Sequence, residues 1–137
     1  MARYLALDIG TKRIGVAISD ALNITAQGLG TIERKSQKYT LDKIRSFFEE
    51  YEIAKIIVGI PLNMNGEKGD SAKSAEEFAR LVEKELSIAV ELVDERLTTL
   101  QGEKVLLEAD ISRRKRKRSI DKIAAQLILQ TYLDSHV

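Results

Sequence analysis

The stretch LALDIGTKRIGVAISD (residues 5–20) decides the fold. Its first apolar run ends at Asp8, and Gly10, Thr11 and Lys12 then separate it from a second apolar run. Two such runs joined by a short glycine-containing turn predict a β-hairpin, with strands at residues 2–9 and 13–19. Strands in a hairpin pair antiparallel, so we expect the chain to begin with two neighbouring strands of one sheet.

Further elements alternate after this hairpin. Residues 28–33 are expected to form a third strand, and the helical spacing of five apolar residues predicts a helix next (Leu41, Ile44, Phe47, Phe48 and Tyr51). The short run KIIVGI (residues 55–60) before Pro61 predicts a buried strand. A helical face (Ala75, Phe78, Val82 and Leu86) then precedes a strand at residues 88–93, and this order implies parallel pairing.

The last third of the chain is expected to be helical. Thr98 and Gln101 fit a capping box that opens a helix toward Ala109, and Ser119 is expected to cap a final helix ending near Leu133. The predicted fold class is therefore α/β. It has a five-stranded mixed sheet, with three strands in a meander and two parallel strands, flanked by helices.

Composition limits the classes of function. The 137 residues fit one domain spanning residues 1–137, and the absence of cysteine excludes disulfides, thiolate zinc sites and a thiol nucleophile. A single histidine, His136, leaves little for a Ser-His-Asp relay or a histidine-rich metal site. No apolar run is long enough for a signal peptide or a membrane span, so we expect a soluble cytoplasmic protein. The formal charge of +1 gives no global argument for a polyanionic partner.

Three acidic positions require an explanation. Asp8 ends a buried strand, where it serves either a functional site or an Asx-type contact in the turn. Asp94 and Glu95 follow another strand, where they bind a cation or pair with Arg96 at a solvated strand end. Strand alternation places Asp94 with Val90 and Leu92, but spacing alone does not choose between the two acids.

Asp121 is predicted to lie in the first turn of the last helix. It either complements the helix dipole there or, as a member of the stripe with Ala125, Ile128 and Tyr132, faces the sheet and needs a partner. If the three acidic positions converge, they form an all-oxygen site suited to Mg²⁺ or Mn²⁺. Two such ions hydrolyse phosphodiesters without a protein nucleophile.

A run of six basic residues precedes Asp121: Arg113, Arg114, Lys115, Arg116, Lys117 and Arg118. Such a run is either a solvated segment or, as a flexible loop beside an acidic metal site, a binding surface for nucleic-acid phosphates. Lys12 and Arg13 are expected to add positive charge beside Asp8.

Four motifs carry a resemblance over nearly the whole chain: LALDIGTKRIGVAISD (5–20), IVGIPLNMNGEKG (57–69), VDERLTTLQGEKVLLEADISRRKRKRSID (93–121) and KIAAQLILQTYL (122–133). Together and in this order they resemble the pre-16S ribosomal RNA nucleases, also described as Holliday-junction-resolvase-like proteins. The resemblance implies a ribonuclease H-like fold and a metal-dependent nuclease, a hydrolase of ester bonds with a two-metal-ion mechanism.

The resemblance also implies roles for individual residues. Asp8, Glu95 and Asp121 are expected to be the catalytic, metal-binding acids, so the resemblance selects Glu95 over Asp94. Arg96, Thr98 and Thr99, in the same motif as Glu95, are expected to support the site or contact the substrate backbone. The implied process is maturation of the 5′ end of 16S ribosomal RNA in a bacterial cytoplasm, with ribosome precursors as partners.

Alternatives remain at this point. A junction resolvase acting on branched DNA keeps the chemistry and changes the substrate, and it needs two active sites, usually in a dimer. A nonenzymatic RNA-binding assembly factor keeps the basic surface without catalysis. The Asp-x-Gly-Thr hairpin also resembles the phosphate loop of actin-like ATPases, but those proteins need a second lobe. The sequence leaves open whether the protein is a monomer or a homodimer, and it predicts no membrane partner.

Overall fold

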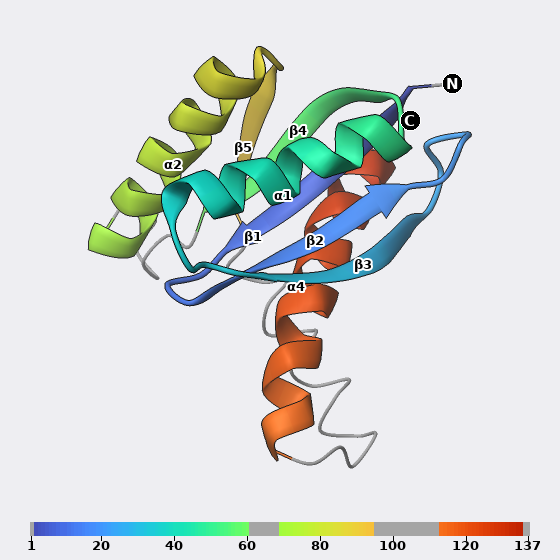
Figure 1. Ribbon diagram of the computed structural model, residues 1–137. Helices are drawn as coiled ribbons and strands as arrows, with labels where there is room; N and C mark the ends of the chain where they lie inside the picture. The colour runs from blue at the N-terminus through green and yellow to red at the C-terminus, as the bar shows by residue number, and fades with distance from the viewer. Residues whose placement is uncertain (1, 61–68, 95–112, 136–137) are drawn as a thin grey trace.

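The structure is a computed structural model that describes residues 2–60, 69–94 and 113–135, without the side chains of residues 113–122. The strands are β1 (Arg3–Ile9), β2 (Arg13–Ser19), β3 (Ala26–Glu33), β4 (Ile53–Ile60) and β5 (Val90–Asp94). The helices are α1 (Gln37–Glu50), α2 (Asp70–Leu86) and α4 (Arg113–Ser135). Figure 1 shows α1 and α2 in front of the sheet and α4 behind it.

The sheet has five strands in the order β3-β2-β1-β4-β5. Strand β2 pairs antiparallel with β1 and β3, whereas β4 pairs parallel with β1 and β5. The predicted hairpin, the three-stranded meander and the parallel pair are therefore confirmed. Strand β1 lies in the middle of the sheet, so it is hydrogen-bonded to a neighbouring strand along both of its edges.

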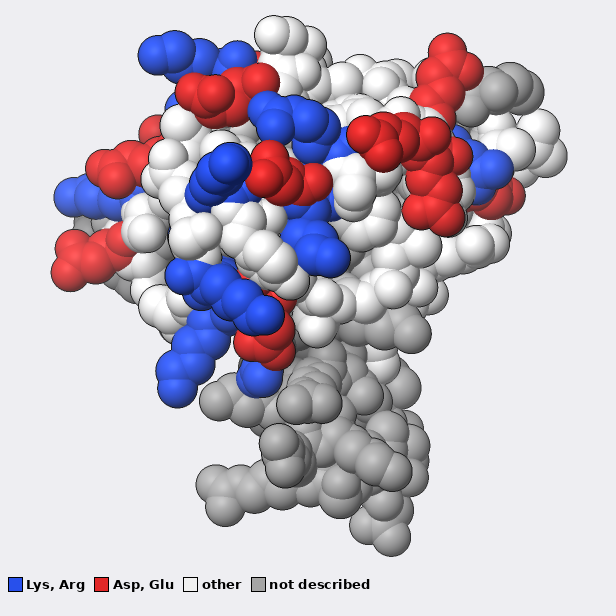
Figure 2. Space-filling model, viewed as in Figure 1, with Lys and Arg blue, Asp and Glu red and all other residues white. Residues whose placement is uncertain are grey.

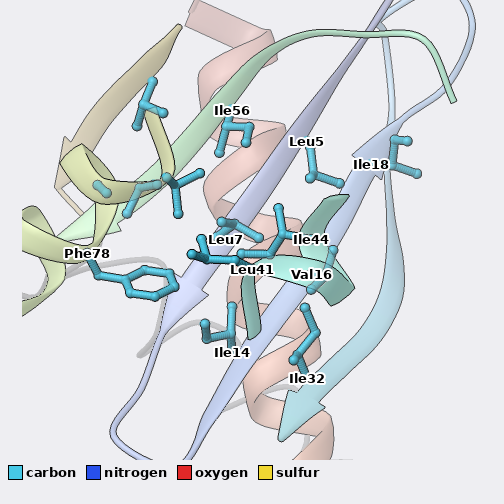
Figure 3. Close-up of a cluster of buried hydrophobic side chains, with 14 residues drawn as sticks. Leu5, Leu7, Ile14, Val16, Ile18, Ile32, Leu41, Ile44, Ile56 and Phe78 are labelled. Carbon is cyan, nitrogen blue, oxygen red and sulfur yellow. The ribbon is translucent and has the colours of Figure 1, made fainter. Parts of the chain in front are cut away.

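One face of the sheet packs against α1 and α2. Leu5 and Leu7 of β1 point to this face and meet Leu41 and Ile44 of α1, as Figure 3 shows. Phe78 of α2 closes the same layer (Figure 3). Alternation along β1 sends the neighbouring residues to the other face.

The opposite face packs against α4. Small residues of the strands, Ala6 and Ala17, lie under Ala125 and Ile128 of the helix. Small side chains on both surfaces let the helix approach the sheet closely. Alternation therefore gives the sheet two apolar layers, one on each face.

Two glutamines fasten α4 to the edge strand β3. The backbone N–H of Ala26 donates to Gln130 Oε1 at 2.9 Å, and Gln126 Nε2 donates to the carbonyl oxygen of Ala26 at 3.1 Å. Gln130 Nε2 also donates to the carbonyl oxygen of Ile24 at 3.0 Å. These bonds satisfy edge-strand groups that the sheet itself leaves unpaired, and they fix where the helix lies along β3.

The predicted start of the last helix is wrong. Helix α4 begins at Arg113, so Ser119 lies inside it and does not cap it. Lysine and arginine have high helix propensity, and the basic run contains no glycine or proline, so nothing in it ends a helix. The helix expected from Thr98 to Ala109 lies outside the described residues, as does His136.

Within the described ranges, no helix combines the length and the apolar character needed to cross a membrane.

Candidate active site

Asp8 lies near the carboxyl end of the central strand, on the face that α4 covers. Its neighbours in the alternation, Tyr4 and Ala6, belong to the apolar layer under α4, whereas Leu5 and Leu7 belong to the opposite layer. The side chain is half-buried. The sequence-based expectation that this carboxylate emerges from an otherwise buried strand is therefore confirmed.

Glycines flank Asp8 on both sides in the sheet. Gly15 of β2 pairs with Asp8 in the antiparallel register, and Gly59 of β4 pairs with it in the parallel register. Both glycines are buried. Because a glycine has no side chain, neither neighbouring strand places one beside the carboxylate.

Strand β5 ends at Asp94, the first of the two adjacent acids. Val93 packs in the layer under α4, whereas Val90 and Leu92 pack in the opposite layer. Asp94 is exposed, and it lines a hollow together with Val93 and residues of α4. The alternation predicted for Val90, Leu92 and Val93 is confirmed. Glu95, Arg96, Thr98 and Thr99 lie outside the described residues.

Asp121 lies on α4, but not where the sequence placed it. The helix begins eight residues earlier, at Arg113, so Asp121 is in the third turn and is not a dipole-complementing residue of the first turn. Ala125, one turn further along, is completely buried against the sheet. The side chain of Asp121 is outside the described part of the chain.

The basic run is helical, which corrects the expectation of a loop. Residues 113–118 form the first turns of α4, and six consecutive residues cover more than one and a half turns. Figure 1 shows these first turns, in orange, extending beyond the sheet at the end where the β1–β2 hairpin lies. The basic run and the hairpin therefore lie at the same end of the molecule.

The hairpin turn beside Asp8 also carries charge. Lys12 is exposed in the turn, and Arg13 begins β2 on the same face as Gly15 and Ala17, and hence on the face of Asp8. The Gly10 N–H donates to the Arg13 carbonyl oxygen at 2.9 Å and closes the turn. A Cβ on Gly10 would lie 2.7 Å from that oxygen, so the turn has no room for a side chain there.

Two groups with displaced pKa values, Lys55 and Tyr132, lie away from this end. Lys55 pairs with Tyr4 at the start of the strands, and its Nζ donates to Tyr132 Oη at 3.1 Å. This bond raises the pKa of Lys55, and burial raises the pKa of Tyr132. Across the described residues, no group of three or more acidic or histidine side chains is close enough to hold a metal ion. Of the three expected acids, Asp8 is the one whose side chain lies within the described part of the chain.

Comparison with known proteins decides the family. The model of a family described as "RuvX: Holliday junction resolvase" matches residues 2–135. The chain belongs to the RuvX family. A RuvX relative from Geobacillus sp. (strain WCH70), named "Putative pre-16S rRNA nuclease", is 51% identical over 135 residues, which cover 97% of this chain and 98% of the relative. A protein of the same name from Clostridium botulinum (strain Hall) is 50% identical over 133 residues and 97% of each chain.

Solved structures give the fold. The RuvC protein of T. thermophilus in complex with a Holliday junction substrate matches with a TM-score of 0.62 at 12% identity, covering 100% of this chain and 98% of RuvC. The fowlpox virus resolvase, with its Holliday junction DNA, matches with a TM-score of 0.58 at 14% identity, covering 98% and 99% of the two chains. The RuvX chain thus has the ribonuclease H-like fold that the resemblance implied.

Sequence reasoning missed the glycines around Asp8 and the glutamines on α4. The signal for the first was present, since Gly15 and Gly59 interrupt strands made otherwise of β-favouring residues. The role of the glutamines had no signal in the sequence, because Gln126 and Gln130 contact residues about 100 positions earlier in the chain.

Proposed function

We propose that this protein is a metal-dependent nuclease that hydrolyses phosphodiester bonds during maturation of the 5′ end of pre-16S ribosomal RNA. One observation carries the proposal: Asp8 lies at the carboxyl end of the central strand, between Gly15 and Gly59, on the face covered by α4. The identity of about 50% to relatives named as pre-16S rRNA nucleases supports the choice of substrate.

The donor set fits a hard divalent cation. Asp8, Glu95 and Asp121 are the proposed metal-binding and catalytic residues, and carboxylate oxygens are the ligands that Mg²⁺ and Mn²⁺ prefer. Gly15 and Gly59, the strand partners of Asp8, place no side chain beside its carboxylate that would compete with such an ion. When bound, two divalent cations activate water for in-line attack and stabilise the leaving oxyanion.

The other residues of the proposed site bind and orient the substrate. Lys12 and Arg13 neutralise backbone phosphates beside Asp8, and the basic residues 113–118 do so from the first turns of α4. Arg96, Thr98 and Thr99 hold the substrate backbone next to Glu95. The chain supplies no covalent nucleophile in this mechanism. The protein acts on ribosome precursors in the bacterial cytoplasm, as a monomer or a homodimer.

The test is cleavage of an RNA that spans the 5′ end of 16S ribosomal RNA, with Mg²⁺ or Mn²⁺ present. Asp8→Asn, Glu95→Gln and Asp121→Asn are expected to lower the rate at least about 100-fold while the circular dichroism spectrum is unchanged. Asp94→Asn is the matched control, because Asp94 is the exposed acid next to Glu95 that the family resemblance does not select, and it should cut like the parent. Equal cutting by Asp8→Asn and the parent would remove the catalytic assignment.

A junction resolvase is the second candidate, favoured by the description of the matching family. A four-way DNA junction offered beside the RNA precursor separates the two functions, because a resolvase makes paired symmetric cuts with two active sites. A third outcome is a nonenzymatic RNA-binding assembly factor. In that case, cells that lack the parent gene grow normally with the Asp8→Asn protein.

A further inference from the structure

Arg34 ties the segment before α1 to the hairpin that follows Asp8. Its backbone N–H donates to the Lys12 carbonyl oxygen at 2.8 Å, and its Nη1 donates to the Gly10 carbonyl oxygen at 2.8 Å. The guanidinium also lies over the Phe78 ring, with Cζ 4.9 Å from the ring centroid. Two hydrogen bonds and one ring contact thus hold Arg34 in place. Of the two hydrogen bonds, only the one to the Gly10 carbonyl oxygen uses a guanidinium N–H donor.

A polar hollow of about 300 Å³ opens beside Arg34. Among the described residues, its lining contains one cation and four uncharged polar residues, and no acid: Thr11, Arg34, Ser36, Gln37 and Thr40. Thr40 Oγ1 is occupied, since it donates to the Ser36 carbonyl oxygen at 2.8 Å. The Thr11 hydroxyl, the Gln37 amide and the remaining guanidinium N–H groups have donors to offer. A lining of donors with one fixed cation suits an anion the size of a phosphate group.

Cationic side chains continue from this hollow over the surface. Residues 34–40 contain three basic residues and no acid, and of these Lys35 and Lys38 are exposed. Lys35 Nζ lies 5.1 Å from the centroid of the Tyr39 ring. Figure 2 shows Lys and Arg side chains gathered at this end of the molecule, below α1, with acidic side chains among them.

We name Lys12, Arg34, Lys35 and Lys38, together with the polar hollow, the hairpin-side cationic strip. We propose that the hairpin-side cationic strip binds backbone phosphates of the RNA strand that flanks the cleaved bond. The inference rests on the proposed function, because it extends the substrate path from Asp8 past the hairpin turn to the start of α1. Several cations in a row match the repeating charge of a polynucleotide better than they match one small anion, and such contacts position a strand without reading its sequence.

The test compares two charge-matched double variants. Lys35→Gln with Lys38→Gln removes two charges from the strip, and Lys73→Gln with Lys84→Gln removes two exposed charges from α2. Binding is measured by fluorescence anisotropy at several salt concentrations, without divalent cations so that the RNA stays intact. One RNA has about 30 nucleotides around the 5′ end of 16S ribosomal RNA, and the other is its central segment of about 6 nucleotides.

The strip variant is expected to bind the long RNA about 10-fold more weakly than the parent at low salt. Its log–log salt slope should be smaller by about 1.4, which is two phosphate contacts at about 0.7 each for a single strand. The α2 variant should match the parent on both RNAs, and the strip variant should match it on the short RNA. Equal affinity and equal salt slope for the strip and α2 variants on the long RNA would overturn the proposal.

The same samples separate this proposal from the proposed function. If the parent protein binds the long RNA through the strip but never cuts it with Mg²⁺ or Mn²⁺, the strip stands and the nuclease assignment fails. If the parent cuts the RNA and the strip variant binds and cuts like the α2 variant, the nuclease stands and the strip fails. If the parent binds no RNA, both fail.

Discussion

Asp8 of β1 and Gly59 of β4 are partners in the parallel register of the sheet. The carboxylate is at the carboxyl end of the central strand, and its partner on β4 has no side chain on the face that α4 covers. In open sheets with parallel strands, ligands collect at the carboxyl ends of strands. The pairing thus places an acid, with a glycine as its partner on β4, where such a sheet binds its ligands.

Replacement of Gly59 tests whether activity needs a position without a side chain beside Asp8. Gly59→Val places a branched side chain beside Asp8, and we expect cleavage to fall at least about 10-fold, more than any loss of folded protein explains. Gln27→Val, at an exposed position of the edge strand β3, adds the same side chain away from Asp8 and should retain activity. The rate of RNA cleavage is measured at a temperature where urea unfolding shows both variants to be folded. A Gly59→Val enzyme as fast as the parent would contradict a need for glycine at this position.

Gly10→Ala tests the turn that follows Asp8. The added Cβ would lie 2.7 Å from the Arg13 carbonyl oxygen, the acceptor of the hydrogen bond that closes the turn. The backbone must shift to relieve this contact, and we expect unfolding in urea to need about 1–3 kcal/mol less free energy. Thr11→Ala, one residue further in the same exposed turn, should change this free energy by less than about 0.5 kcal/mol. Equal stability of the two variants would show that the turn adapts without cost.

Gln130→Ala tests how α4 is held. The substitution removes the acceptor of the Ala26 N–H and the donor to the Ile24 carbonyl oxygen. Loss of these partners is expected to cost about 1–2 kcal/mol, and cleavage is expected to fall further because α4 carries Asp121. Thr131→Ala, at the neighbouring exposed position, is the control and should lose neither stability nor activity. Urea unfolding and the cleavage rate of the folded fraction give the two quantities separately. A loss of stability without a loss of rate would mean that Gln130 does not position the site.

The strands around Asp8 could be predicted from the sequence because their signals are local. Apolar runs on both sides of Gly10, Thr11 and Lys12 require only neighbouring residues, and β2 has the predicted bounds. Alternation along β5 likewise predicts correctly that Val93 and Leu92 pack on opposite faces of the sheet. The start of α4 could not be predicted, because a basic run resembles a solvated loop by charge and a helix by propensity, and charge does not decide between them.

The candidate site was predictable residue by residue only through the family resemblance. Glu95 and Asp94 have the same chemistry and adjacent positions, so the sequence pattern alone gave no preference. Whether Asp8, Glu95 and Asp121 meet depends on how α4 crosses the sheet, and contacts such as Gln126 with Ala26 that set this crossing join distant parts of the chain. Interactions of this kind leave no periodic trace in the sequence.

The final prediction concerns stability at alkaline pH. Lys55 Nζ donates to Tyr132 Oη, and this bond raises the pKa of Lys55 above its ordinary 10.5, while burial raises the pKa of Tyr132 above its ordinary 10.0. Both groups hold their protons more tightly in the folded protein than in the unfolded chain. Their contribution to stability is therefore complete below the unfolded pKa values and is lost as the pH rises through the folded ones.

Tyr132→Phe is expected to remove this pH dependence at a modest cost at neutral pH. The melting temperature of the parent should fall steeply above about pH 10. At neutral pH the variant should be less stable by about 1 kcal/mol in free energy of unfolding, for one lost hydrogen bond, and its melting temperature should fall less as the pH rises. Tyr39→Phe removes a hydroxyl from α1, outside this contact, and serves as the matched control. Melting temperatures between about pH 7 and 11 provide the measurement. Parallel curves for the parent and Tyr132→Phe would show that the Lys55–Tyr132 contact is not the source of the alkaline loss.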